Sequence, residues 1–203
     1  MYQGSQVSTP AIKGLLLTNV LVFLLFSQPA FGRPILGLFA LWPPGHFMPW
    51  QLVSYAFIHG DFGHLFFNMF ALWMFGTQIE YAWGTRRFLI FYFGCVIGAA
   101  LTQLLTAYLS GLVYPTVGAS GGVFGILLAF GMMFPNRKLM LLFPPIPIKA
   151  KFFVLGYGLL ELWLGVFGMQ TGVAHFAHLG GMFFGFVLIQ YWRGRWPFHS
   201  QRI

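Results

Sequence analysis

Long apolar runs alternate along the chain with short polar, glycine-rich or basic stretches. The hydrophobic positions predict helices near residues 14–31, 64–81, 88–109, 120–134, 152–168 and 175–192. Most of these runs approach the length that crosses roughly 30 Å of hydrocarbon at about 1.5 Å per helical residue. The pattern therefore predicts an all-α integral membrane protein, in which a six-transmembrane-helix bundle forms a single membrane domain over residues 1–203.

An irregular stretch, residues 32–59, separates the first two runs. Prolines combined with tryptophans are typical of a loop that lies in the membrane interface, and this stretch contains Pro34, Trp42, Pro43, Pro44, Pro49 and Trp50. The first run, with Lys13 before it and Ala30-Phe31-Gly32 at its end, also resembles a cleavable secretory signal. Its apolar run is long for a signal peptide, so we interpret it as a retained helix.

The composition excludes a water-soluble domain, because 58% of the residues are hydrophobic and only 7% are charged. Ten of the 11 Lys and Arg residues fall on one side of the predicted bundle, and Arg33 falls on the other. By the positive-inside rule, both termini are expected to be cytoplasmic, including the short basic tail 193–203. This orientation accounts for the net charge of +8, so no nucleic-acid partner is expected.

A serine and a histidine begin two of the predicted helices. The run that starts at Ser120 spans only about 24 Å up to Pro135, so Ser120 is expected to lie below the outer membrane surface. His178 lies in the first turn of the last helix, which runs in the same direction across the membrane. Topology therefore predicts that Ser120 and His178 lie at similar depth, with the site open to the outer side.

Small residues favour close contact between these two helices. His178 shares one helical face with glycines three and seven residues later, and a glycine contact would bring the imidazole within reach of the serine. Ordinary packing glycines are the alternative interpretation, because small residues at such spacing are common in membrane helices. The glycines concerned are Gly118, Gly121, Gly125, Gly181 and Gly185.

A serine beside a histidine is the minimum unit for acyl transfer, because neutral imidazole can accept the hydroxyl proton. The chain has only three acidic residues, so we expect a catalytic dyad of Ser120 and His178 without a carboxylate partner. His64 and Asn68 are four residues apart on one helical face. Their side chains, with the backbone N–H of Ser120, are expected to form the oxyanion hole.

The remaining polar residues favour structural roles. Glu161 lies in the middle of a predicted helix, and we interpret it as protonated and hydrogen-bonded within the bundle, with a place at the substrate entrance as the alternative. Glu80 is expected to bond the turn at Gly84-Thr85. A metal site of His175 and His178 with His64 is conceivable, but no glutamate has the H-E-x-x-H spacing, so we predict no metal and no cofactor.

These motifs, in this order, resemble the rhomboid intramembrane serine proteases in their six-helix bacterial form. The resemblance runs from about Trp50 to Gly185 and rests on an ordered set of motifs. They are His59 and His64 with Asn68 four residues later, Glu80 followed by Gly84-Thr85, Gly118-Ala119-Ser120-Gly121, and Ala177-His178 followed by Gly181 and Gly185.

The resemblance implies that Ser120 is the nucleophile, that His178 is the general base and then the general acid, and that His64 and Asn68 stabilise the oxyanion. It also implies cleavage in or near transmembrane segments of other proteins in the lipid bilayer, without a cofactor. The expected location is a bacterial cytoplasmic membrane. The sequence does not indicate the oligomeric state.

Two positions depart from the family's common pattern. Gln51 follows Trp50 where the family often has arginine, and Phe124 stands where it often has tyrosine. A phenyl ring at position 124 can still pack beneath the imidazole. The alternative functions are a catalytically silent rhomboid-like protein that binds transmembrane helices and a small transporter. The transporter is disfavoured, because the sequence lacks paired intramembrane charges and repeated halves.

Overall fold

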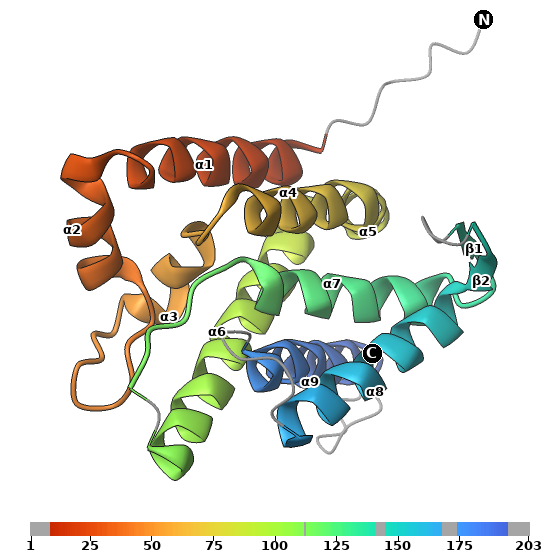
Figure 1. The fold of residues 1–203 in the computed structure, drawn as a ribbon. Coiled ribbons are helices and arrows are strands. Elements are labelled where there is room, and N and C mark those ends of the chain that lie inside the picture. Colours follow the sequence, from red (N-terminus) through yellow and green to blue (C-terminus); the bar gives the residue numbers. More distant parts are fainter. Residues whose placement is uncertain (1–8, 112, 141–144, 168–173, 195–203) are drawn as a thin grey trace, which may run out of the picture.

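The computed structural model describes residues 9–111, 113–140, 145–167 and 174–194, and most of them are helical (Figure 1). The helices are α1 (Pro10–Phe26), α2 (Pro29–Phe39), α3 (Gln51–Ser54), α4 (Phe62–Ala71), α5 (Thr77–Trp83), α6 (Thr85–Ser110), α7 (Ser120–Met133), α8 (Ala150–Phe167) and α9 (His175–Trp192). Helices therefore occupy most of each predicted run, whereas the start of the chain differs from the prediction.

The first helix does not continue through residues 14–31. α1 ends at Phe26, and α2 leaves it at 119° (Figure 1). Pro29 starts α2, and the preceding Gln28 has an extended backbone, as expected for a residue before proline. Part of the stretch predicted to be irregular, residues 32–59, is therefore helical, in α2, α3 and the short turn η1 (Tyr55–Phe57).

The helix that carries His64 and Asn68 continues from Phe62 to Trp83 with a change of winding in the middle. α4 leads into η2 (Leu72–Gly76), a π-helical turn, and α5 follows without a break. A cap fixes the start, because the Asp61 side chain accepts the backbone N–H of His64 at 2.8 Å. Gly84, at a φ of 78°, turns the chain from α5 into α6.

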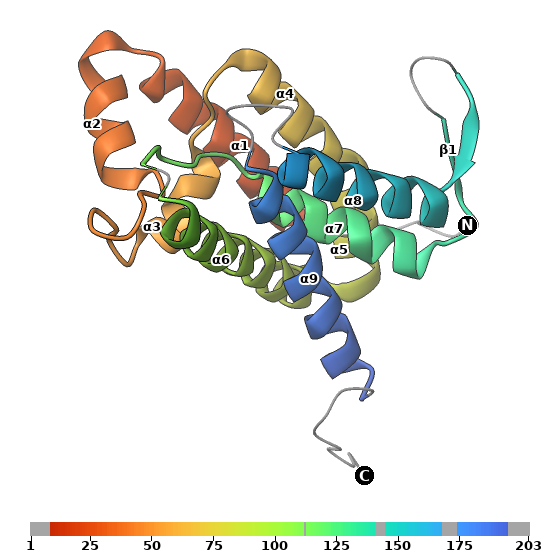
Figure 2. The same cartoon turned by 60° about the horizontal axis from the view of Figure 1, so that its bottom comes forward.

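Three helices form the centre of the bundle. α9 packs against both α6 and α7, and α8 covers the remaining side of α7 and α9 (Figure 2). α6 contributes a fully buried stripe that includes Phe91, Tyr92 and Cys95. Because α7 and α9 both begin on the same side of the bundle as the first loop, their N-terminal residues meet there (Figure 1).

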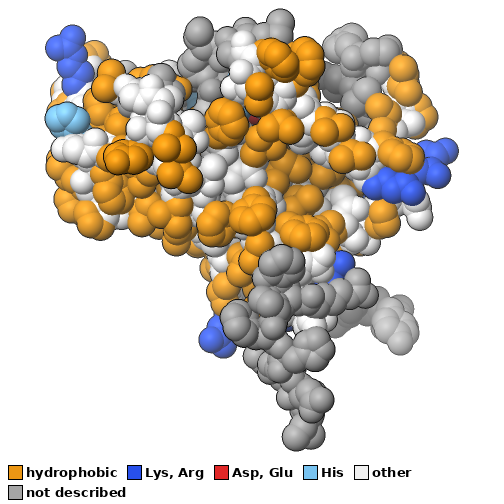
Figure 3. All heavy atoms as spheres, turned by 90° about the horizontal axis from the view of Figure 1, so that it is seen from below, with side chains coloured by type: hydrophobic (Ala, Val, Ile, Leu, Met, Phe, Trp, Pro, Cys, Tyr) orange, Lys and Arg blue, Asp and Glu red, His pale blue; other side chains and the backbone are white. Residues whose placement is uncertain are grey.

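The described residues contain two helices, α6 and α8, that are long and apolar enough to cross a membrane, and the bent pair α1–α2 raises the count to as many as three. α7 is apolar but only 14 residues long. The number of six crossings therefore stays a prediction. Apolar side chains cover most of the face shown in Figure 3, and the basic side chains visible there lie towards its edges.

A small β-hairpin, which the sequence pattern did not indicate, follows α7. β1 (Lys138–Met140) pairs antiparallel with β2 (Pro147–Lys149), so that Lys138 and Lys149 face each other across the strands. Four of the ten basic residues expected on one side thus lie in or next to this hairpin, at the end of α7 away from Ser120: Arg137, Lys138, Lys149 and Lys151. The predicted basic tail lies outside the described residues beyond Gly194.

Candidate active site

Ser120 and His178 lie in direct contact. The Nε2 atom of His178 is 2.8 Å from the Ser120 hydroxyl oxygen, although the two residues are 58 positions apart. The predicted glycine contact produces this approach, because a Cβ atom at Gly181 would collide with the carbonyl oxygen of Gly121. Only glycine at position 181 lets the backbones of α7 and α9 come this close.

Phe124 holds the imidazole from below, as the sequence predicted. Its ring stacks on His178 with centroids 4.2 Å apart and planes at 6°. Tyr157 of α8 stacks on the opposite face of Phe124 at 5.3 Å and 17°. Three parallel rings from α7, α8 and α9 therefore restrict the tilt of the histidine, and they keep its Nε2 edge on Ser120.

The expectation of a site without a carboxylate is wrong. Glu161 of α8 places its Oε2 atom 2.9 Å from Nδ1 of His178 and 2.7 Å from Nδ1 of His175. The sequence did not reveal this contact, because Glu161 and His178 belong to different helices and no helical spacing relates them. The contact depends on the angle at which α8 crosses α9, which only the assembled bundle defines.

The loop before Ser120 is held in an unusual conformation. Gly118 has a φ of 121°, and a Cβ atom there would lie 2.6 Å from Nε2 of His64, so this position requires glycine. The backbone N–H of Ala119 donates to His59 Nε2 at 3.4 Å. Burial, followed by the nearby His64, lowers the pKa of His59 to about 3, which keeps this ring neutral and able to accept.

His64 and Asn68 reach the serine from the other side. Both line the same hollow as Ser120 and His178, and the His64 ring lies against Gly118. The Asn68 amide donates to the His64 carbonyl oxygen at 2.9 Å. The sequence thus predicted correctly that His64 and Asn68 lie in the same hollow as Ser120. Their role in stabilising an oxyanion stays a prediction.

A hollow of about 660 Å³ surrounds these residues and extends along the bundle. Its polar end contains His64, Asn68, Ser120 and His178. Its apolar end lies between the helix containing α4 and η2 on one side and α8 on the other, and it is lined by Phe70, Met74, Phe153 and Tyr157. The hollow therefore combines polar side chains around the serine with an apolar lining.

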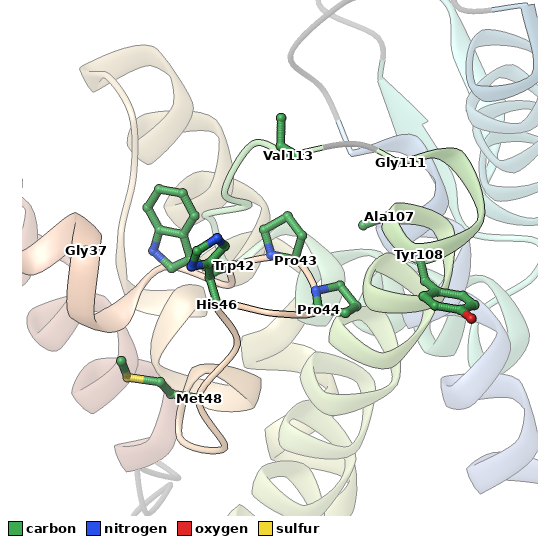
Figure 4. Close-up of a pocket in the computed structure, with 10 residues that line it drawn as sticks. All are labelled: Gly37, Trp42, Pro43, Pro44, His46, Met48, Ala107, Tyr108, Gly111 and Val113. Atoms are coloured by element: carbon green, nitrogen blue, oxygen red, sulfur yellow. The ribbon is translucent and has the colours of Figure 1, made fainter.

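A second hollow, of about 670 Å³, lies in the first loop between α2 and the end of α6 (Figure 4). The first loop lines it with Trp42, Pro43, Pro44, His46 and Met48, and the end of α6 lines it with Ala107 and Tyr108. Trp42 donates its indole N–H to the Leu36 carbonyl oxygen, which ties the loop to α2. The first loop is thus a packed structure built from aromatic residues and prolines.

Three ligand atoms suited to a metal come together within 4.8 Å of one another, from Glu161, His175 and His178. Ligands that share a zinc ion at about 2.0–2.2 Å lie more than 3 Å apart. The two imidazole nitrogens lie 2.7 and 2.9 Å from the same carboxylate oxygen, which are hydrogen-bond distances. The described geometry is therefore that of a hydrogen-bonded cluster, and the absence of a metal stays a prediction.

Glu80 has the structural contact expected for it. Its carboxylate accepts the Thr85 hydroxyl at 2.7 Å. It also accepts the backbone N–H groups of Ala11 and Ile12 at 3.0 and 2.9 Å, at the first turn of α1. A carboxylate at a helix N-terminus satisfies N–H groups that have no partner within the helix, so Glu80 fastens α1 to α5.

Comparison with known proteins agrees with this geometry. The sequence profile of the Rhomboid domain matches residues 46–195, which include every residue of the site. The chain belongs to the rhomboid family. Among curated rhomboid proteins, the chain is 35% identical over 138 residues to Rhomboid protein 1, mitochondrial, of Saccharomyces cerevisiae, covering 67% of this chain and 40% of that protein.

Two further relatives of the chain come from a mammal and from a bacterium. The chain is 28% identical over 195 residues to the presenilin-associated rhomboid-like protein, mitochondrial, of Rattus norvegicus, covering 92% of this chain and 51% of that protein. It is 31% identical over 138 residues to the rhomboid protease GluP of Bacillus subtilis, covering 68% of this chain and 25% of that protein.

The chain thus spans about half or less of the length of these relatives. Because several of them are mitochondrial, the expectation of a bacterial cytoplasmic membrane is not supported. The chain is a membrane-embedded member of a family that includes proteases.

Proposed function

We propose that this rhomboid is an intramembrane serine endopeptidase that hydrolyses peptide bonds in or near transmembrane segments of other membrane proteins. The observation that carries the proposal is the 2.8 Å contact between Nε2 of His178 and the Ser120 hydroxyl, inside an apolar bundle. An imidazole at this distance can take the hydroxyl proton as the oxygen attacks a carbonyl carbon.

The chemistry divides into two half-reactions. In the first, Ser120 Oγ bonds to the substrate carbonyl carbon, its proton passes to His178 Nε2, and the imidazolium then protonates the leaving amine nitrogen as the C–N bond breaks. In the second, a water oxygen bonds to the acyl carbon while His178 Nε2 takes a proton from that water. The ester bond between the acyl carbon and Ser120 Oγ then breaks, the proton passes from His178 to Oγ, and the carboxylic acid product leaves. Each cycle consumes one water and restores both side chains, and no cofactor takes part in either half-reaction.

The oxyanion requires donors on the side of the carbonyl opposite the histidine. Ser120 begins α7, so its backbone N–H belongs to a helical turn in which such groups lack partners within the helix. His64 and Asn68 line the same hollow from α4. We assign these three groups to the oxyanion hole.

The hollow also supports the class of substrate. A transmembrane helix shields its carbonyl groups in hydrogen bonds, so a segment must unwind before the serine can attack it. The apolar side of the hollow, between α4 and α8, offers Met74 and Phe153 to such an unwound segment. We propose that residues 1–203 act as one membrane domain, with both termini on the cytoplasmic side and the site open to the opposite side.

A fluorophosphonate probe tests the proposal directly, because it labels only an activated serine. The purified wild type in detergent should be labelled, and Ser120→Ala and His178→Ala should each abolish the labelling while leaving the protein folded. Ser110→Ala and His46→Ala are matched controls outside the site, since Ser110 bonds only Thr106 and His46 lies in the first loop. A folded wild type that is never labelled would instead favour a catalytically silent protein that binds transmembrane helices.

A further inference from the structure

The structure assigns Glu161 a role that the sequence did not indicate. We propose that it is a positioning residue that fixes the tautomer of His178 and stabilises the imidazolium formed during attack. Ser120, His178 and Glu161 then act as an ordered array. This inference rests on the proposed protease function, and it goes beyond a dyad of serine and histidine.

An unbroken line of hydrogen bonds supports the array. The Ser120 hydroxyl oxygen lies 2.8 Å from one imidazole nitrogen of His178, and Glu161 Oε2 lies 2.9 Å from the other. Glu161 is 6% exposed and His178 is 8% exposed. Burial excludes competing water and strengthens both contacts, so the imidazole is held from its two opposite nitrogens.

The chemistry of the carboxylate determines the tautomer. An ionised carboxylate only accepts hydrogen bonds, so Nδ1 of His178 must carry the proton. Nε2 is then left with its lone pair facing the Ser120 hydroxyl, which is the form a general base requires. Without Glu161, either nitrogen of His178 could carry the proton, and a part of the molecules would be inactive at any moment.

The charge of the carboxylate acts at the next step. When the serine proton moves to Nε2, the imidazole becomes positive while the negative charge develops on the substrate oxygen. A fixed negative charge 2.9 Å from Nδ1 favours that imidazolium. The proton remains on His178 until it passes to the leaving nitrogen, and Glu161 neither gains nor loses one.

His175 holds the carboxylate in place. It is the first residue of α9, and its Nδ1 lies 2.7 Å from the same Oε2 atom. The imidazoles of His175 and His178, which lie one turn apart on α9, therefore both hydrogen-bond to the same oxygen of Glu161 on α8. This second contact offsets part of the cost of burying an ionised carboxylate, and it fixes the oxygen opposite His178.

Few other ionisable groups surround the array. Among the described residues, three ionisable groups face His178 or Glu161: His64 of α4, Tyr157 of α8 and His175 of α9. Cys95 of α6 lies further along α9, against Gly125 and Gly185. Asp61, which caps α4, is a second carboxylate that lines the same hollow, but among the described residues Glu161 is the carboxylate that bonds His178, so its removal changes the charge beside the imidazole in a defined way.

Glu161→Gln isolates the charge, because glutamine keeps the shape and can still accept one hydrogen bond. The rate of fluorophosphonate labelling should fall by at least about tenfold. The acid limb of the rate against pH should also move to lower pH, because the imidazolium has lost the negative charge 2.9 Å from its Nδ1. The measurement compares labelling rates of wild type and variant between about pH 5 and pH 9.

Glu80→Gln is the matched control, since Glu80 is also buried and hydrogen-bonded but lies at the other end of the bundle. It should lower thermal stability and leave the acid limb where it is. An unchanged rate in Glu161→Gln, or a slower rate with an unmoved acid limb, overturns the inference while the protease function stands. If the wild type itself is not labelled, the protease function has failed instead.

A measurement on the wild type decides the matter if Glu161→Gln does not fold. In protein labelled with nitrogen-15 at histidine, the Nδ1 signal of His178 should be that of a protonated nitrogen at mildly alkaline pH, with Nε2 unprotonated. Comparison with His178→Ala assigns the signal. The opposite tautomer would overturn the inference, and this result does not depend on any enzymatic activity.

Discussion

At the scale of single residues, the site depends on side chains that are each held by a second contact. Asp61 caps the turn that carries His64, and the Phe124 ring supports His178. Asn68 is tied to the His64 carbonyl oxygen at 2.9 Å. Such supports fix the positions of the reacting groups before substrate arrives, and this preorganisation gives hydrogen bonds their catalytic effect.

Asn68 provides a test at this scale. Asn68→Ala should lower the rate of cleavage by about a hundredfold if its amide donates to the oxyanion, while His64 and the Ser120 backbone compensate in part. Turnover of a transmembrane substrate in detergent measures the effect. Asn19→Ala is the matched control, because Asn19 is also buried and bonds the carbonyl four residues earlier, at 2.8 Å, but on α1. Equal rates in the two variants would leave Asn68 with a structural role only.

At the scale of helices, the contact between α7 and α9 creates the site. Their glycines remove the side chains that would hold the backbones apart, so Ser120 and His178 approach although each lies at the end of its own helix. α8 then adds Glu161 from the side. The site is therefore a junction of the first turns of α7 and α9 with the side of α8, and a small change in one crossing would separate its members.

Gly181→Ala should disturb that junction strongly. Its methyl group would meet the Gly121 backbone, which cannot move aside as a side chain would. We expect a loss of about 1–3 kcal/mol in stability and most of the labelling activity. Thermal denaturation in detergent and fluorophosphonate labelling measure the two effects.

Gly156→Ala on α8 is the control for this change, because a Cβ atom there meets nothing within 4 Å. It should be neutral, or stabilising by up to about 1 kcal/mol through the better helix propensity of alanine. A stable and fully active Gly181→Ala would contradict the view that this glycine contact brings Ser120 and His178 together.

At the scale of the whole molecule, polarity is distributed as a membrane requires. The outward faces of α1, α4 and α8 carry exposed leucine, phenylalanine and tryptophan side chains, whereas the hydrogen-bonded polar groups of the site lie inside. The first loop and the β-hairpin lie at opposite ends of α7 (Figure 1). This arrangement supports the proposed orientation, with the serine below the surface on the side of the first loop.

Labelling of introduced cysteines tests the orientation. In spheroplasts of a bacterial host, His46→Cys should react with an impermeant maleimide from outside, and Lys138→Cys should react only after the membrane is opened. The wild type is the blank, because its single cysteine, Cys95, is fully buried. The reverse pattern would place the site on the cytoplasmic side.

The sequence by itself determined most of the helices and four of the side chains that surround the site. Apolar runs predict the helices that face the lipid or pack in the core. The glycine spacings predicted that α7 and α9 are in contact. Ser120, His178, His64 and Asn68 were recognisable because each lies at a helix start or at a helical spacing from another group. The bend at Pro29 was missed although Ser27-Gln28-Pro29 interrupts the apolar run there, because apolar residues on both sides favoured one continuous helix.

Only the tertiary structure decided the role of Glu161. Sequence spacing relates residues on one helix face, whereas the approach of Glu161 to His178 depends on how α8 crosses α9. The β-hairpin was likewise decided by the pairing of two short segments that carry no alternating pattern. Long-range contacts between elements are the part of this protein that local pattern cannot encode, because they depend on packing of the whole bundle.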